Sequence, residues 1–166
     1  MGDCKNRYEG KEKEMRDYKF RGKPIEDVDF DEINVHISKD DFVYGNLIVD
    51  GDQAWIVSGV IESTNDYITL EQWIPVRPET VGQFTGIKDK NDVEIYEGDV
   101  VKIVNNYNEA TKKTSDNVVV KFKDGSFIVT WDVGEYEHYN HFTSYNTPIV
   151  TFEVIGNIHD KEECDD

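Results

Sequence analysis

A pair of histidines is the first place where this sequence could support chemistry. His138 and His141 lie three positions apart in the stretch EYEHYNHF. They could ligate a metal ion if the segment were helical and a third ligand came from elsewhere. Tyrosines and a phenylalanine surround the pair, which favours a partly buried aromatic loop instead, and neither cysteine is near in sequence. We therefore expect no metal site.

Carboxylates offer a second possibility. Glu94, Glu97 and Asp99 could supply an acid and a base for glycosidase or nuclease chemistry. However, the chain has 35 Asp and Glu residues, so neighbouring acids are expected by chance. Catalysis also needs a perturbed environment, which spacing does not reveal. We interpret Asp99 as a turn cap and the two glutamates as solvated side chains.

Motifs of well-known enzyme classes give no support for catalysis. The glycines fall singly at turns, without the GxxxxGK[ST] or GxGxxG patterns that hold nucleotide phosphates. Four histidines and scattered serines define no Ser-His-Asp triad, because such a triad is recognised by geometry. We expect no catalytic residue, no cofactor and no enzymatic activity. A small hydrolase with an unrecognised site is kept as an alternative.

The net charge of −17 opposes binding to nucleic acid, which depends chiefly on Lys and Arg. Four aromatic residues could stack on single-stranded bases, but we assign them to core or interface positions: Trp55, Trp73, Trp131 and Tyr96. The acidity favours solubility. The alternative is an acidic surface that mimics DNA and inhibits a host nucleic-acid-binding protein.

Composition points to a sheet protein of the cytoplasm. At 166 residues the chain has the size of one domain or two very small ones. Aromatic residues make up 12% and are interleaved with Val, Ile and Thr, which favour strands. Cys4 and Cys164 are too few for a disulfide framework. No stretch resembles a signal peptide or a membrane span, so we expect a soluble, cytoplasmic protein without membrane contact.

Apolar residues recur with a period near two, which predicts antiparallel strands. One predicted hairpin pairs residues 42–49 with 54–61, and a second pairs 118–122 with 126–131 around Asp124 and Gly125. Further strands are predicted at residues 67–76, 93–96, 100–104 and 149–158. At most, short helical turns are expected near Glu32 or Glu135.

Polar stretches divide the chain. Residues 1–15 are predicted to be a flexible leader, and residues 159–166 an acidic tail. Between them we expect a β domain at 16–158, either whole or as two small subdomains at about 16–80 and 81–158. Residues 105–117 have no apolar period and predict a long mobile loop.

The most specific segment is residues 76–102, VRPETVGQFTGIKDKNDVEIYEGDVVK. Thr85 and Gly86 are predicted to end one strand, and the Gly98-Asp99 step to turn the chain into another. The segment resembles the signature of the YopX family of phage and prophage proteins. Three further pieces follow in the order of that family: DYKFRGK at 17–23, YGNLI at 44–48 and FEVIGNI at 152–158. Asp92 stands where glycine is common in the family, which leaves that turn's geometry open.

This resemblance implies a mainly β fold of SH3-like barrel character, with partly open barrels of antiparallel strands. It implies a phage or prophage accessory protein of undefined biochemical role, without catalytic residues to carry over. We therefore expect a non-enzymatic β module that binds a protein partner or assembles with itself as a homo-oligomer.

Overall fold

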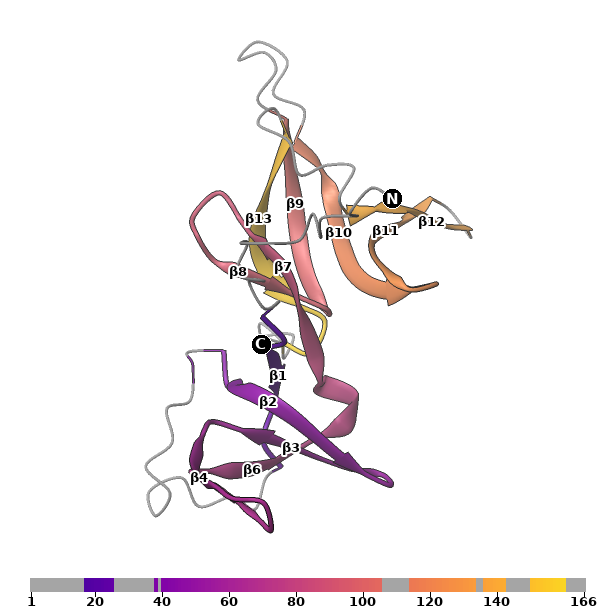
Figure 1. Ribbon diagram of the computed structural model, residues 1–166. Coiled ribbons are helices and arrows are strands. Elements are labelled where there is room, and N and C mark those ends of the chain that lie inside the picture. Colours follow the sequence, from indigo (N-terminus) through magenta and orange to yellow (C-terminus); the bar gives the residue numbers. More distant parts are fainter. Residues whose placement is uncertain are drawn as a thin grey trace, which may run out of the picture.

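Strands dominate the computed structural model of this chain (Figure 1), which describes residues 17–25, 38, 40–105, 114–133, 136–142 and 150–160. The regular elements of these residues are strands, apart from 3-10 turns such as η1 (Pro78–Thr80). The expected mainly β class is confirmed. The predicted leader at 1–15 and the turns predicted near Glu32 and Glu135 lie outside the described residues.

A six-stranded antiparallel sheet contains the first half of the chain, in the order β6-β3-β2-β1-β7-β8. Its strands are β1 (Phe20–Gly22), β2 (Val43–Asp50), β3 (Gln53–Val57), β6 (Trp73–Val76), β7 (Gly82–Lys88) and β8 (Glu94–Tyr96). A separate two-stranded sheet joins β4 (Val60–Ser63) to β5 (Ile68–Leu70). We call β1 to β6 the N-terminal lobe, and Figure 1 shows β7 rising from it.

The second half of the chain forms a five-stranded antiparallel sheet in the order β12-β11-β10-β9-β13. Its strands are β9 (Asp99–Asn105), β10 (Thr114–Lys123), β11 (Ser126–Val133), β12 (Tyr136–His141) and β13 (Val150–Asn157). Figure 1 shows that the sheet curls along β10 and β11 into a half barrel. The expected partly open barrel is thereby confirmed. We call β8 to β13 the C-terminal lobe.

Turn chemistry follows the sequence closely. Asp124 and Gly125 have φ angles of 50° and 80°, as a tight hairpin turn with two left-handed residues requires. Gly98 has a φ of 85° at the corner between β8 and β9, which only glycine adopts without strain. Asp92 adopts a φ of 64°, the left-handed conformation that a glycine would take there. The turn therefore keeps its form despite the aspartate.

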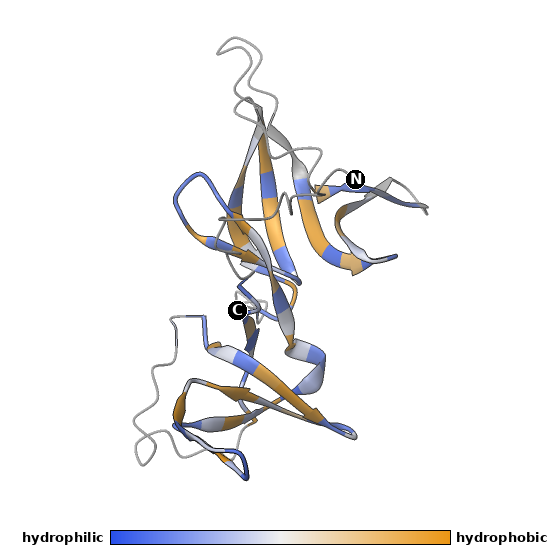
Figure 2. Cartoon of the chain, viewed as in Figure 1, coloured by the Kyte–Doolittle hydropathy of each residue, from blue (hydrophilic) through white to orange (hydrophobic). Residues whose placement is uncertain are grey.

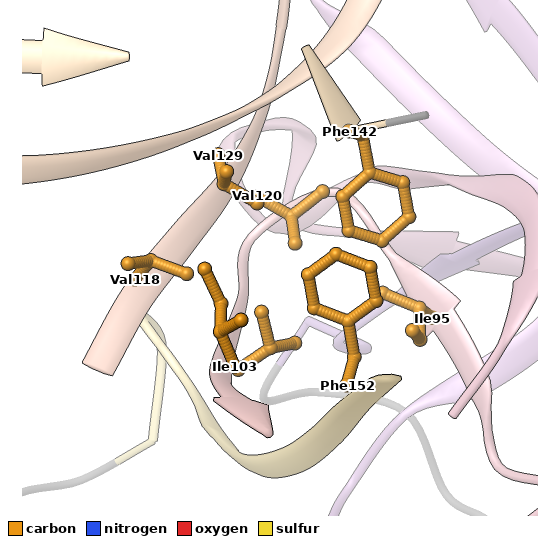
Figure 3. Packing of buried hydrophobic residues seen from close by; sticks show 8 residues of the cluster. Ile95, Ile103, Val118, Val120, Val129, Phe142 and Phe152 are labelled. Carbon is orange, nitrogen blue, oxygen red and sulfur yellow. The ribbon is translucent and has the colours of Figure 1, made fainter. Parts of the chain in front are cut away.

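Each lobe has its own apolar core. In the N-terminal lobe it consists of Val43, Ala54, Ile56, Ile74 and Val76. In the C-terminal lobe it is larger: Ile95, Val101, Ile103, Val118, Val120, Val129, Phe142 and Phe152. The rings of Phe142 and Phe152 stack on one another in this core, with centroids 4.4 Å apart, and Figure 3 shows them among the surrounding Val and Ile side chains. Figure 2 shows the apolar stretches along the strands of both lobes.

Two predicted strands are each broken in two. The strand predicted at 54–61 divides into β3 and β4, and the strand predicted at 67–76 divides into β5 and β6. The breaks lie opposite one another and are bridged by backbone bonds from Ser58 N–H to the Gln72 carbonyl and from Glu71 N–H to the Gly59 carbonyl. The prediction was wrong because the apolar alternation continues across this break. The break interrupts the regular strand pairing, but the two bonds keep the two sides of the hairpin together.

Three other boundaries also differ from the prediction. β7 does not end at Thr85 and Gly86 but runs on to Lys88, with its pairing to β8 shifted between Phe84 and Lys88. The predicted aromatic loop at 136–142 is mostly strand β12, paired along β11. The loop predicted at 105–117 overlaps strands at both ends, because β9 extends to Asn105 and β10 begins at Thr114, and residues 106–113 lie outside the described residues. Pairing with a neighbouring strand accounts for each extension.

Candidate functional site

Three cations on one face of the chain around β1 join the two lobes. Side chains two apart in an extended strand share a face, so Lys19, Arg21 and Lys23 point the same way. Each binds an acid of the C-terminal lobe or the segment that follows it: Lys19 to Glu94 at 2.6 Å, Arg21 to Asp99 at 2.5 Å and Lys23 to Asp160 at 3.4 Å. We call these three ion pairs the lobe seam.

The central pair of the lobe seam, Arg21 with Asp99, is buried. The Arg21 guanidinium lies over the rings of Phe42 and Tyr96, at 4.4 and 4.8 Å from their centroids. Besides Arg21, the Asp99 carboxylate accepts hydrogen bonds from the Tyr96 amide at 2.8 Å and from Asn157 Nδ2 at 3.3 Å. Burial raises the pKa of Asp99, while Arg21 and the Tyr96 amide act in the opposite direction. Both oxygens of this carboxylate are thus engaged in holding the lobes together.

The Lys19–Glu94 pair lies at the more exposed end of the lobe seam. Glu94 Oε2 also accepts a hydrogen bond from the Tyr96 hydroxyl at 2.6 Å. Burial by itself raises the pKa of Glu94, but the bonds from Lys19 and Tyr96 outweigh it and hold that pKa below its ordinary value. Burial and the neighbouring Glu94 carboxylate raise the pKa of Tyr96. Glu94 is therefore an ionised hydrogen-bond acceptor rather than a protonated acid.

A cavity of about 400 Å³ lies beside the lobe seam, with Arg21, Glu94 and Asp99 in its wall. Asp89, also in the wall, accepts bonds from the backbone amides of Asn91, Val93 and Val154. These carboxylates are thus already bonded to protein groups. Asp89, Glu94 and Asp99 therefore serve to hold the fold together at this cavity.

The carboxylates predicted as an acid cluster are indeed close together but have structural roles. Asp99 caps its turn as expected, and in addition it forms a buried ion pair with Arg21. The prediction that Glu94 and Glu97 are solvated was wrong. Glu94 is half-buried in the lobe seam, and Glu97 is half-buried while its carboxylate accepts a bond from the Phe122 amide at 3.3 Å.

The two histidines do not converge on a common point. They belong to strand β12, where positions three apart face opposite sides of the sheet. His138 stacks on Trp131 with ring centroids 6.0 Å apart, and His141 Nδ1 lies 3.2 Å from the Ser126 hydroxyl. Within the described part of the chain, no three His, Cys, Asp or Glu side chains gather in a way that could hold a metal ion.

The aromatic residues considered for base stacking are divided between the lobes. Tyr96 is buried in the core region, as expected, and Trp131 is half-buried in the C-terminal lobe. Trp55 and Trp73 stack on one another in the N-terminal lobe, with centroids 6.3 Å apart. Trp73 is 64% exposed, so of the two expected positions, core or interface, it does not occupy the core.

An exposed apolar surface in the N-terminal lobe was not predicted from the sequence. We call the hairpin of β4 and β5 with its turn the arm (residues 60–70). Several of its large apolar residues are mostly exposed: Val60, Ile61, Tyr67 and Ile68. The turn is ordered by Thr64, whose hydroxyl accepts bonds from the amides of Asp66 and Tyr67. A sequence signal did exist, since two short apolar runs flank a polar turn, but the same signal marks a buried hairpin.

Comparisons with known proteins place the chain in a family. None of the curated proteins compared matches it. In the described residues no helix is long and apolar enough to cross a bilayer. The crystal structure of protein yopX from Bacillus subtilis is 19% identical, with an alignment that covers 90% of this chain and 98% of that one at a TM-score of 0.44. The family model described as YopX protein matches residues 25–164, which is most of the sequence. The chain therefore belongs to the YopX protein family.

Proposed function

We propose that this chain is a non-enzymatic accessory protein of phages or prophages that binds a protein partner, or a second copy of itself, through the N-terminal lobe. The observation that carries the proposal is the exposed arm. Large apolar patches on a protein surface mark interaction sites, because water solvates them poorly. Family membership adds no specific activity and is consistent with an accessory role.

The arm is poorly stabilised by its own contacts. Within the described residues its two strands pair only with each other, and all four residues of β4 are exposed. A lone two-stranded hairpin is marginally stable in water, since it has no third strand and no second layer against which to bury apolar area. A partner that covered the arm would supply that layer.

The acids of the lobe seam support a non-enzymatic role. A hydrolase of the carboxylate type needs one acid free to give a proton and another free to take one. Asp99 and Glu94 instead accept bonds from Arg21, Lys19 and Tyr96. The bonds from Arg21 and Lys19 attach the two lobes to one another.

A sedimentation experiment tests the self-binding branch. The full chain is measured from low to high micromolar concentration, beside an Ile68→Thr variant. Self-association through the arm is supported if the mass rises with concentration in the natural chain but not in the Ile68→Thr variant. A clean monomer at every concentration removes the self-binding branch and leaves a protein partner of another kind.

An activity assay tests the non-enzymatic claim. The chain is incubated with p-nitrophenyl esters and bis-p-nitrophenyl phosphate. We expect no turnover above the uncatalysed rate. Turnover that Glu94→Gln abolishes and Ile68→Thr preserves would overturn the proposal in favour of a small hydrolase.

A further inference from the structure

The arm is the outer half of one long ribbon. β3 and β4 form one side of the ribbon, and β5 and β6 the other. The backbone bonds Ser58–Gln72 and Glu71–Gly59 join its two halves. The inner half is part of the six-stranded sheet, whereas the outer half forms the separate pair β4–β5. The sheet therefore holds the arm firmly at its base and leaves the rest in solvent.

Strand register gives the arm one apolar face. Directly opposed residues of an antiparallel pair point to the same side. Val60 faces Leu70 and Ser63 faces Ile68, and because the register shifts between Val60 and Glu62, these four residues share one side although Val60 and Ser63 lie three apart. Val60 and Ile68 are 58% and 62% exposed. The pair Glu62 and Thr69 forms the other, polar side.

The base of the arm carries a second apolar surface. Trp73 begins β6 and stacks on Trp55 of β3, while Ile48 of β2 lies directly opposite Trp55. Trp73 and Ile48 are both exposed. Tryptophan is enriched at the centres of protein interfaces, where its large ring buries much area at a small entropic cost.

The stretch of chain that contains the arm and its base carries charge of a single sign. Residues 40–76 include no Lys or Arg, but they include seven acids: Asp40, Asp41, Asp50, Asp52, Glu62, Asp66 and Glu71. The ion pairs of the described residues all use acids outside this stretch. A second copy would bring the same acids against them, and like charges brought together at an interface oppose binding.

We propose that the arm and Trp73 dock a different protein, one whose surface has an apolar centre and a rim of Lys and Arg. This inference rests on the proposed binding function and specifies the partner. Apolar contact with Val60, Ile68 and Trp73 supplies the buried area. The unbalanced acids attract the basic rim and exclude both nucleic acid and a second copy.

Three short synthetic peptides of equal length test the inference. In the first, valine alternates with lysine; in the second, valine alternates with glutamate; in the third, threonine alternates with lysine. Binding is followed by tryptophan fluorescence and by amide chemical shifts of the full chain. We expect the Val–Lys peptide to bind about tenfold tighter than either of the others, which corresponds to about 1.4 kcal/mol, and to weaken as salt is added.

Matched variants locate the binding surface. Ile68→Lys should lower the affinity for the Val–Lys peptide about tenfold. The new lysine places a positive charge in the apolar face, where it repels the lysines of the peptide. Phe122→Lys is the control, since Phe122 is 51% exposed in the C-terminal lobe, and it should leave the affinity unchanged. Circular dichroism confirms that both variants are folded. Equal losses in the two variants would overturn the assignment to the arm.

The three peptides also separate the inference from the function on which it rests. Equal binding of the Val–Lys and Val–Glu peptides contradicts the basic rim but retains a binding arm. Equal binding of the Val–Lys and Thr–Lys peptides contradicts the apolar centre and favours recognition by charge alone, as a DNA mimic would use. Binding of none of them, by a chain that stays monomeric, contradicts both proposals.

Discussion

The two lobes differ in what they do with their apolar side chains. The C-terminal lobe curls around its core and buries large rings such as Phe142 and Phe152. The N-terminal lobe has a smaller core of Val, Ile and Ala, and seven large apolar residues between 48 and 73 are exposed: Ile48, Val49, Val60, Ile61, Tyr67, Ile68 and Trp73. Curvature allows the C-terminal sheet to cover its own inner face, whereas the β4–β5 pair of the N-terminal lobe leaves its apolar side chains exposed. We therefore propose that the C-terminal lobe supplies most of the stability and the N-terminal lobe the binding surface.

Removing a ring from the larger core tests the stability side of this comparison most strongly. Phe152→Ala should lower the free energy of unfolding by about 4 kcal/mol, since it deletes a fully buried ring and leaves a cavity. Urea denaturation measures the change. Phe122→Ala, which removes an exposed ring packed against Phe127, should cost about 1 kcal/mol or less. Similar losses in both variants would mean that the C-terminal core does not dominate stability.

Breaking the buried ion pair tests whether the lobes unfold together. Arg21→Met should cost about 3 kcal/mol, because it leaves the Asp99 carboxylate buried without its cation. The double variant Arg21→Met with Asp99→Leu should recover much of that loss. Fluorescence of Trp55 and Trp73 reports on one lobe, and that of Trp131 on the other. Effects that simply add in the double variant would show that the two side chains act independently.

The exposed end of the lobe seam should give the smallest effect. Lys19→Met should cost about 1 kcal/mol or less, since both partners are partly solvated. The pKa of Glu94 is lower in the folded chain than its ordinary value of 4.5. Its stabilisation is therefore present above that value and is lost as the pH falls through the lower, folded-state pKa.

Urea denaturation at several pH values measures this loss. The difference between the natural chain and Lys19→Met should shrink as Glu94 is protonated. Lys121→Met, at an exposed ion pair with Glu137, is the control and should have a smaller effect at neutral pH. A difference that stays constant with pH would show that Lys19 contributes through packing rather than charge.

Local features of this fold could be predicted from the sequence, and distant pairings could not. The turns at Asp124-Gly125 and Gly98-Asp99 were predicted correctly, because glycine and aspartate determine backbone geometry within a few residues. Strand β12 was missed, because its aromatic and polar residues lack clean alternation and only pairing with β11 makes it a strand.

The partner of Arg21 lay beyond the reach of sequence patterns. A single chain carries many acids, and nothing in the spacing of the DYKFRGK stretch singles out Asp99 from the rest. The exposure of the arm could not be predicted either, since Val60 and Ile68 are residue types that are usually buried, yet both are exposed here. Only the absence of a third strand beside β4 and β5 in the described residues reveals it.

The lobe seam also sets the order in which this protein can fold. Lys19, Arg21 and Lys23 reach partners 75, 78 and 137 residues further along the chain. Contacts of such long range are slow to form, since a large loop must close before any bond rewards it. Because these partners lie so much later in the sequence, the ribosome releases the N-terminal strands well before the carboxylates emerge. During that interval the three cations lack these partners, and we expect docking of the two halves to be a late step that Asp160, after the last strand, completes.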